Sequence, residues 1–127
     1  MATFEVSTWD DLKSKVAEAA EGDTVYLTAD IDMNAVYPEG LPREAQITTG
    51  SSNKDVYIDG GSQHHKIKNL YIRSLETNNT VTVFSSVLGS YNHSPHLFIN
   101  NVDFENVVLD WTKDGPPKLF YGTKCTN

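Results

Sequence analysis

The sequence predicts an all-β domain in which short strands wind into a solenoid behind one N-terminal amphipathic helix. Three observations lead to this prediction: a helical period near the start of the chain, many very short apolar runs after it, and a strand motif that recurs. The length of 127 residues fits a single domain. We therefore expect residues 1–127 to form one unit, with a helical cap over 7–22, solenoid turns over 23–127 and a loop excursion over 34–54.

The helix is expected over residues 8–21, because apolar side chains recur there at helical spacing. Ser7 or Thr8 is a suitable N-cap, with an aspartate three residues further on as in a capping box, and Gly22 suits the position after the helix. Such a helix has one apolar face, which we expect to cover an apolar end of the domain. The residues of this face are Trp9, Leu12, Val16 and either Ala19 or Ala20.

Short runs of alternating apolar and polar residues dominate the rest of the chain. Alternation at a period of two places one face of each strand in the core. Runs of this length and frequency are typical of a barrel, a sandwich or a solenoid. The segment 34–54 contains two prolines and two glycines, which indicates a loop that leaves the strands. The runs are residues 3–6, 24–33, 56–58, 66–72, 80–88, 96–104, 106–111 and 118–122.

Self-similarity among these runs favours the solenoid. The motifs "VYL" from residue 25, "VYI" from residue 56, "LFI" from residue 97 and "LFY" from residue 119 have the same pattern. The last interval is about 22 residues, a typical length for one turn of a parallel β-solenoid. The chain then has room for about three to four turns of this length.

Three phrases carry a family resemblance: "TWDDLKSKVAEAAEGDTVYLTADI" (8–31), "VYIDGG" with "HKIKNLYI" (56–72), and "LFINNVDFENVVLD" (97–110). They resemble the N-terminal region of right-handed parallel β-helix proteins of the pectate-lyase-like superfamily. The resemblance implies a short right-handed parallel β-helix of about three to four rungs with an N-terminal capping helix, of the phage or bacterial surface type. It also implies inward asparagines that stack along the axis. The candidates are Asn69, Asn101 and Asn106.

Asp103 and Glu105 are the candidates for acid chemistry. They are two residues apart, so on a strand they share the solvent face, while Val102 and Phe104 point to the core. Glycoside hydrolases use a pair of carboxylates in this way. The alternative is the ordinary polar face of a half-buried strand. We interpret them as such a face and expect no catalytic residue.

The histidines fall in two clusters, His64 with His65 and His93 with His96. Neighbouring histidines on an extended segment face opposite ways, and the proline in "HSPH" excludes a helical zinc-binding spacing. We interpret them as loop histidines and expect no metal and no cofactor. Cys125 is the single cysteine, so the chain has no internal disulfide, and only a lysine adjoins it to activate the thiol.

Three aromatic side chains are expected to point outward from their strands: Tyr57, Tyr71 and Phe98. They could form a ladder on one face, which would serve either as a subunit interface or as a platform for a carbohydrate, because both need flat apolar area. Scattered surface aromatics are the third interpretation. We treat these three residues as candidate binding or interface residues.

Charge and composition restrict the classes of molecule that the protein is expected to bind. The chain is 39% hydrophobic and 21% charged, which is typical of a folded protein. Seventeen acids against ten bases give a net charge of -7, which disfavours nucleic acid and anionic membranes as partners. The start of the sequence has neither the basic nor the apolar region of a signal peptide. We expect a protein made in the cytoplasm that reaches a virion or an extracellular surface by assembly.

These observations predict a structural or attachment module of a virion or cell-surface assembly, of the phage appendage or decoration type, and not an enzyme. Residues 118–127 contain no second cap-like helix. We expect that end to meet another copy of the chain, with a trimer favoured, or another structural protein. The alternative is a glycan-binding or glycan-degrading (hydrolase or lyase) β-helix protein.

Overall fold

The structure is a computed structural model that describes residues 1–49, 54–73, 81–86, 95–110 and 117–127. Strands make up 43% of the described residues, which also contain one α-helix. The expectation of a mostly β protein with one N-terminal helix is therefore confirmed. The helices are α1 (Trp9–Glu18) and the 3-10 turns η1 (Met33–Ala35) and η2 (Arg43–Ala45). The strands are β1 (Thr3–Val6), β2 (Thr24–Leu27), β3 (Ile31–Asp32), β4 (Ile47–Thr48), β5 (Val56–Asp59), β6 (Lys66–Lys68), β7 (Tyr71–Arg73), β8 (Thr82–Ser85), β9 (Leu97–Asn100), β10 (Asp103–Glu105), β11 (Val108–Asp110), β12 (Lys118–Tyr121) and β13 (Thr123–Thr126).

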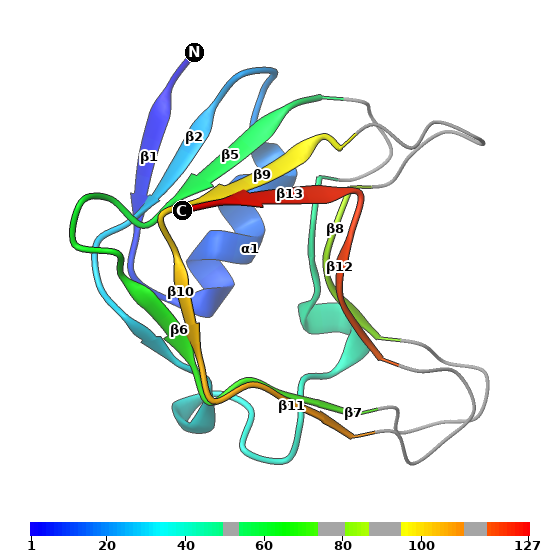
Figure 1. The fold of residues 1–127 in the computed structure, drawn as a ribbon. Coiled ribbons are helices and arrows are strands. Elements are labelled where there is room, and N and C mark those ends of the chain that lie inside the picture. Colours follow the sequence, from blue (N-terminus) through cyan, green and yellow to red (C-terminus); the bar gives the residue numbers. More distant parts are fainter. Residues whose placement is uncertain (50–53, 74–80, 87–94, 111–116) are drawn as a thin grey trace.

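All strand pairings among the described residues are parallel, and they form four sheets. The chain passes through β5, β6, β7 and β8, and then through β9, β10, β11 and β12 in the same order of sheets (Figure 1). Each strand of the second series lies beside its counterpart in the first. We call β2 to β4 the first turn, β5 to β8 the second turn and β9 to β12 the last turn. The sheet orders are β1-β2-β5-β9-β13, β10-β6-β3, β11-β7 and β12-β8-β4.

The predicted repeat length of about 22 residues is wrong. Residues that lie side by side in neighbouring turns, such as Asp32 and Asn69 or Asn69 and Asn106, are 37 positions apart. Three of the four recurring motifs do lie together, because β2, β5 and β9 are neighbours in one sheet. The fourth motif lies in β12, which pairs with β8 in another sheet. The chain crosses four sheets before it returns, so it covers more residues in one turn than the motif interval indicated.

The core lies inside the four sheets and follows from the alternation along each strand. In β2, β5 and β9 every second residue is buried and its neighbour is half-buried. Because neighbouring strands are parallel and in register, apolar side chains of successive turns stack on one another, as in the row Ile31, Ile67 and Phe104. Apolar area removed from water stabilises the fold by about 25 cal/mol per Å², so these stacked rows are its main support.

The helix α1 begins as the sequence predicts and ends earlier. Thr8 is the N-cap, and its Oγ1 accepts a hydrogen bond from the Asp11 amide over 3.2 Å. The helix ends at Glu18 instead of residue 21, because Ala19 already has extended backbone. The carboxylate of Asp23 accepts hydrogen bonds from the amides of Ala20 and Ala2, at 2.8 Å each, and so ties the end of the helix to the N-terminal segment.

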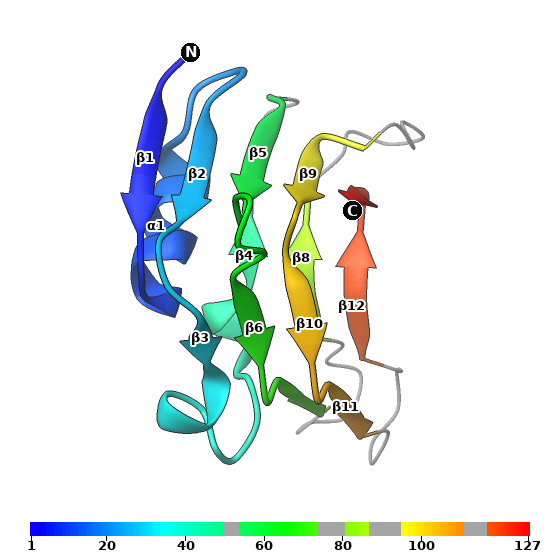
Figure 2. The ribbon, with the colours of Figure 1, turned by 60° about the vertical axis from the view of Figure 1, so that its left-hand side comes forward.

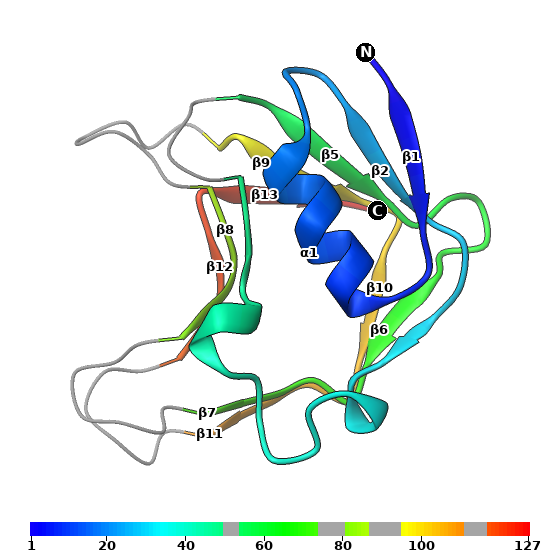
Figure 3. The same cartoon turned by 180° about the vertical axis from the view of Figure 1, so that it is seen from behind.

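The helix α1 lies across one end of the stack, seen from behind in Figure 3, with its apolar face buried. Trp9, Leu12 and Val16 are 0% exposed, and Ala19 is buried as well. The Trp9 indole Nε1 donates to the carbonyl oxygen of Ala45 over 2.7 Å, and its ring meets the Phe84 ring edge-on. The predicted buried face is therefore confirmed.

The segment 34–54 departs from the strands only in part. It holds most of η1 and all of η2, and between them Leu41 is fully buried. The short strand β4 also lies within it and pairs in parallel with β8. Through β4, the segment thus supplies the side of the first turn that lies in the sheet of β8 and β12.

Candidate functional site

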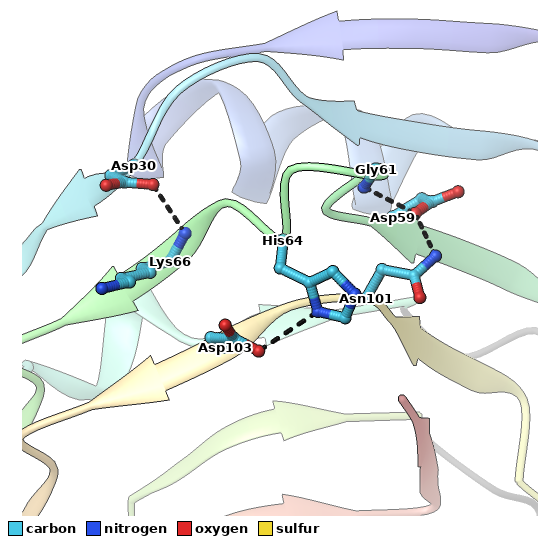
Figure 4. Close-up of polar contacts among 7 residues, drawn as sticks. All are labelled: Asp30, Asp59, Gly61, His64, Lys66, Asn101 and Asp103. Atoms are coloured by element: carbon cyan, nitrogen blue, oxygen red, sulfur yellow. Dashed lines mark hydrogen bonds and ion pairs between the residues drawn. The ribbon is translucent and has the colours of Figure 1, made fainter.

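The loop between β5 and β6 holds a cluster of polar contacts that joins neighbouring turns (Figure 4). Asp59 Oδ1 accepts hydrogen bonds from the amide of Gly61 over 2.8 Å and from Nδ2 of Asn101 over 3.1 Å. Gly60 is required by close approach, because a Cβ atom there would lie 2.0 Å from the carbonyl oxygen of Asn101. The sequence Asp59-Gly60-Gly61 is therefore a turn shaped by its neighbour in the stack.

Both histidines of this loop contact carboxylates of the turns on either side. His64 Nδ1 lies 3.3 Å from Oδ1 of Asp103, in the last turn. His65 Nδ1 lies 3.4 Å from Oδ1 of Asp30, just before β3 of the first turn. As predicted, the two neighbouring side chains face different ways. They reach different turns and do not converge on one ion.

His96 makes a similar contact outside the loop, with its Nδ1 2.8 Å from Oδ1 of Asp55. Its Nε2 is buried and has no hydrogen-bond partner in the described part of the chain. His93 lies outside the described residues. Within the ranges that the structure describes, no group of three or more His, Cys, Asp and Glu residues could hold a metal ion. Cys125 is on β13, and desolvation raises the pKa of its thiol, the opposite of what a nucleophilic thiolate needs.

Asp103 and Glu105 share the outer face of β10, as predicted, with side chains 51% and 55% exposed. Phe104 between them packs against the core. Each acid is engaged by the second turn: Asp103 contacts His64, and Glu105 Oε1 lies 3.8 Å from Nζ of Lys66. These contacts suit a role in joining turns.

The asparagines stack, but not inside the core as the resemblance implied. Asn69 Nδ2 donates to Oδ1 of Asp32 over 2.9 Å, and Asn106 Nδ2 donates to Oδ1 of Asn69 over 2.8 Å. Asn69 and Asn106 have left-handed backbone, with φ of 60° and 56°, at the corner where one sheet gives way to the next. Asn101 has φ of 57° at another corner. Corner residues of this kind are partly exposed, while Leu70 beside them is buried. We call Asp32, Asn69 and Asn106 the corner ladder.

Three carboxylates have lowered pKa values because hydrogen bonds favour their charged form. The amides of Ala2 and Ala20 lower the pKa of Asp23. The amide of Lys66 lowers that of Asp30, with a smaller effect from His65. The side chain of Asn69, followed by the amide of Asn34, lowers that of Asp32. These acids support the fold in their ionised form. Each of the three accepts bonds from residues distant in sequence: Ala2, Lys66 and Asn69.

The three predicted aromatics do not form one ladder. Tyr57 and Phe98 lie in register on β5 and β9, with ring centroids 4.9 Å apart and an angle of 17° between the rings. Tyr71 lies on β7 in another sheet, and its hydroxyl donates to Oδ2 of Asp110 over 2.6 Å. Each ring of the Tyr57–Phe98 pair covers one face of the other, which reduces the flat area left for a sugar ring.

The last turn exposes apolar side chains that are not among the three aromatics predicted to point outward as a ladder. Leu109 on β11 and Phe120 and Tyr121 on β12 are 54%, 36% and 48% exposed. Both strands pair on one side only among the described strands. The signal for Leu109 was the run "VVL" at 107–109, where alternation fails. We call Leu109, Phe120 and Tyr121 the last-turn apolar surface.

The fold and its contacts define a mostly β protein with parallel strands and a single described α-helix. Among the described residues no helix is long and apolar enough to cross a membrane. Comparison with family models, with curated proteins and with solved structures finds no match to this chain.

Proposed function

We propose that the chain is a short right-handed parallel β-helix that serves as a structural or attachment module of a virion or cell-surface assembly, of the phage appendage or decoration type, without catalysis of its own. The observation that carries the proposal is the difference between its ends. One end is covered by α1, whereas the last turn exposes large apolar side chains. Among the described strands, the outermost strands at both ends pair on one side only, and those of the last turn include β11 and β12. Such an edge accepts another chain.

Two features support the β-helix. The chain visits the four sheets in a fixed order, and each pairing is parallel across a long connection. Connections between parallel strands of one sheet are right-handed in nearly all proteins, because a right-twisted strand packs back onto the sheet only that way. The corner ladder adds support, since side-chain hydrogen bonds between turns require the corners to be in register.

A second copy of the chain is the partner that we propose for the last-turn apolar surface, in a trimer or another closed oligomer. Leu109, Phe120 and Tyr121 are large apolar side chains, and such residues are typical of the centres of interfaces. Phe120 also stacks on Phe84, with centroids 5.8 Å apart, so part of this surface is held rigidly by the core. Rigid aromatic anchors reduce the entropy lost on association.

The contacts of Asp103 and Glu105 support a non-catalytic role. A general acid of a glycosidase needs a carboxyl group directed at substrate, and both groups here contact basic side chains of the second turn. The amide variants D103N and E105Q test this directly. We expect the double variant to retain whatever attachment activity the intact protein has. Depolymerase activity in the native protein that disappears in the double variant would establish the hydrolase alternative.

Sedimentation velocity at micromolar concentration tests the oligomer. The native chain is expected to sediment as an oligomer, and L109E with Y121E is expected to sediment as a monomer with an unchanged circular dichroism spectrum. V36E is the matched control, because Val36 is also exposed (41%) but lies after η1, outside all described strands. A native chain that sediments as a monomer would overturn the proposed partner.

A further inference from the structure

A cavity of about 240 Å³ lies beside the corner ladder. It is positioned where β6 gives way to β7 and β10 to β11, and neither the fold nor the assembly proposed above uses it. Its walls combine three side-chain amides with one aromatic and two aliphatic side chains, none of which is charged at neutral pH. The lining residues are Asn34, Asn69, Leu70, Tyr71, Asn106 and Val108.

The amides of the cavity have hydrogen-bonding capacity that the protein itself does not use. Asn106 donates one hydrogen of its side-chain amide to Oδ1 of Asn69. The Oδ1 of Asn106 has no partner among the described residues. Asn34 is bonded through its backbone amide to Asp32, while its side chain has no partner in the described part of the chain. A side-chain amide offers both donors and an acceptor. This combination matches hydroxyl groups, which also donate and accept.

The lining also contains apolar residues, and Tyr71 among them is held in place by hydrogen bonds. The Tyr71 hydroxyl donates a hydrogen bond to Asp110. The backbone carbonyl of Tyr71 accepts a hydrogen bond from the Leu41 amide over 2.9 Å. Leu70 is only 1% exposed, so its side chain belongs to the core and backs the cavity without offering surface to it, whereas Val108 is 47% exposed. A fixed aromatic ring beside aliphatic groups suits the C–H face of a sugar ring.

Charge and size restrict the ligand further. Two lining residues donate hydrogen bonds to carboxylates, Asn69 to Asp32 and Tyr71 to Asp110, and Lys68 also acts on Asp32. Hydrogen bonds lower the pKa of Asp32, so it is negative at neutral pH and repels anions. The volume is below the range of about 300–1,000 Å³ that holds drug-sized ligands. One ring fits this space better than a chain of rings.

We propose that this cavity binds a single neutral pyranose unit, the terminal or branching residue of a glycan, with Asn34 and Asn106 on its hydroxyl groups and Tyr71 and Val108 against its C–H face. The proposal deepens the attachment role proposed above and rests on it for its biological meaning. Binding itself needs no oligomer, because Leu109, Phe120 and Tyr121 do not line the cavity. A negative result for sugar binding therefore does not contradict the proposed oligomer, and a monomeric chain does not contradict sugar binding.

The test is a titration of the native, isotope-labelled protein with methyl β-D-glucopyranoside and with methyl β-D-galactopyranoside, followed by amide NMR. We expect saturable shifts of the side-chain amides of Asn34 and Asn106 with at least one of the two probes. The charged methyl glucuronide is expected to bind at least fivefold more weakly. The double variant N34A with N106G is expected to lose at least tenfold in affinity, since it removes two hydrogen-bonding groups.

Controls separate binding from folding. Glycine at 106 keeps the left-handed backbone available, and N101G is its match at another corner, where φ is 57°. N101G should bind the probe with native affinity, whereas V108W, which fills the rim, should not bind it. The proposal is overturned if neither methyl glycoside shifts the cavity residues, if N34A with N106G binds as the native protein does, or if the glucuronide binds more tightly. Sedimentation of N34A with N106G as an oligomer would leave the assembly proposal intact in each of these cases.

Discussion

The two ends of the stack differ in how their apolar residues meet water. At one end α1 lies across the turns, and its Trp9 and Leu12 are 0% exposed. At the other end Leu109 and Tyr121 are 54% and 48% exposed, on strands that pair on one side only among those described. Figure 2 shows the two ends at opposite sides of the molecule, with β1 and α1 at one and β12 at the other.

This difference shows what a stack of parallel strands requires at its limits. Each internal turn receives its hydrogen bonds and its apolar contacts from the turns before and after it. A terminal turn lacks one of those neighbours, so its strands and its core need another cover. At one end the helix covers the core within the chain, by burying Trp9, Leu12 and Val16. We propose that a second copy supplies the cover at the other.

The largest expected effect is at the covered end. Trp9→Ala removes a fully buried ring, its bond to the Ala45 carbonyl and its contact with Phe84. We expect a loss of about 3–5 kcal/mol in the free energy of unfolding, measured by urea denaturation. Leu109→Ala, measured below the concentration at which the chain associates, should cost less than about 0.5 kcal/mol. Equal costs at the two positions would show that the ends do not differ as described.

The next effect concerns the contact between internal turns. Gly60→Ala places a methyl group against the Asn101 carbonyl oxygen of the next turn, where a Cβ would lie at 2.0 Å. We expect a cost of about 2–3 kcal/mol, because the two backbones must separate. Ser62→Ala, at an exposed position of the same loop, is the control and should be neutral within about 0.5 kcal/mol. Native stability in Gly60→Ala would contradict the close approach of the turns.

A smaller effect is expected at the start of the cap. Thr8→Ala removes the side-chain oxygen that accepts from the Asp11 amide. Loss of such an N-cap costs about 1 kcal/mol. Thermal unfolding followed by circular dichroism measures it, with Ser7→Ala as the neighbouring exposed control. If both substitutions shift the melting temperature equally, Thr8 is not the N-cap in solution.

The pH dependence should come mainly from the carboxylates that tie distant segments together. Hydrogen bonds hold the pKa of Asp23 below its ordinary value of 3.8. A group with a depressed folded pKa contributes stability that is present above its unfolded pKa and is lost as the pH falls through the folded value. The free energy of unfolding should therefore decline as the pH drops below 3.8. Asp23→Asn should flatten that decline, and Glu39→Gln, an exposed acid without a described contact, should leave it unchanged.

Local features were predictable because they depend on residues close in sequence. The period of α1, its N-cap at Thr8 and its buried face follow from positions within three or four residues of one another. The early end of the helix at Glu18 was not predictable in this way. It depends on Asp23, whose carboxylate bonds both Ala20 and the distant Ala2.

The stacking of turns was predictable only in part, because it depends on how many sheets the chain crosses before it returns. Alternation placed Tyr57 and Phe98 on outer faces, and their rings do stack. It could not show that Tyr71 belongs to another sheet. Nor could the asparagine pattern show where Asn69 and Asn106 point, since their left-handed backbone at a corner sets that direction. The cavity beside them arises from the same corner.

Hydrogen–deuterium exchange at two protein concentrations tests the central claim most directly. Between about 0.1 and 50 µM, spanning typical affinities of specific complexes, we predict that protection rises with concentration in β11 and β12. In β1 and α1 protection should stay constant, because the helix already covers that end within one chain. Protection of β11 and β12 that does not change with concentration, in a native chain that stays folded, would contradict the proposed difference between the two ends.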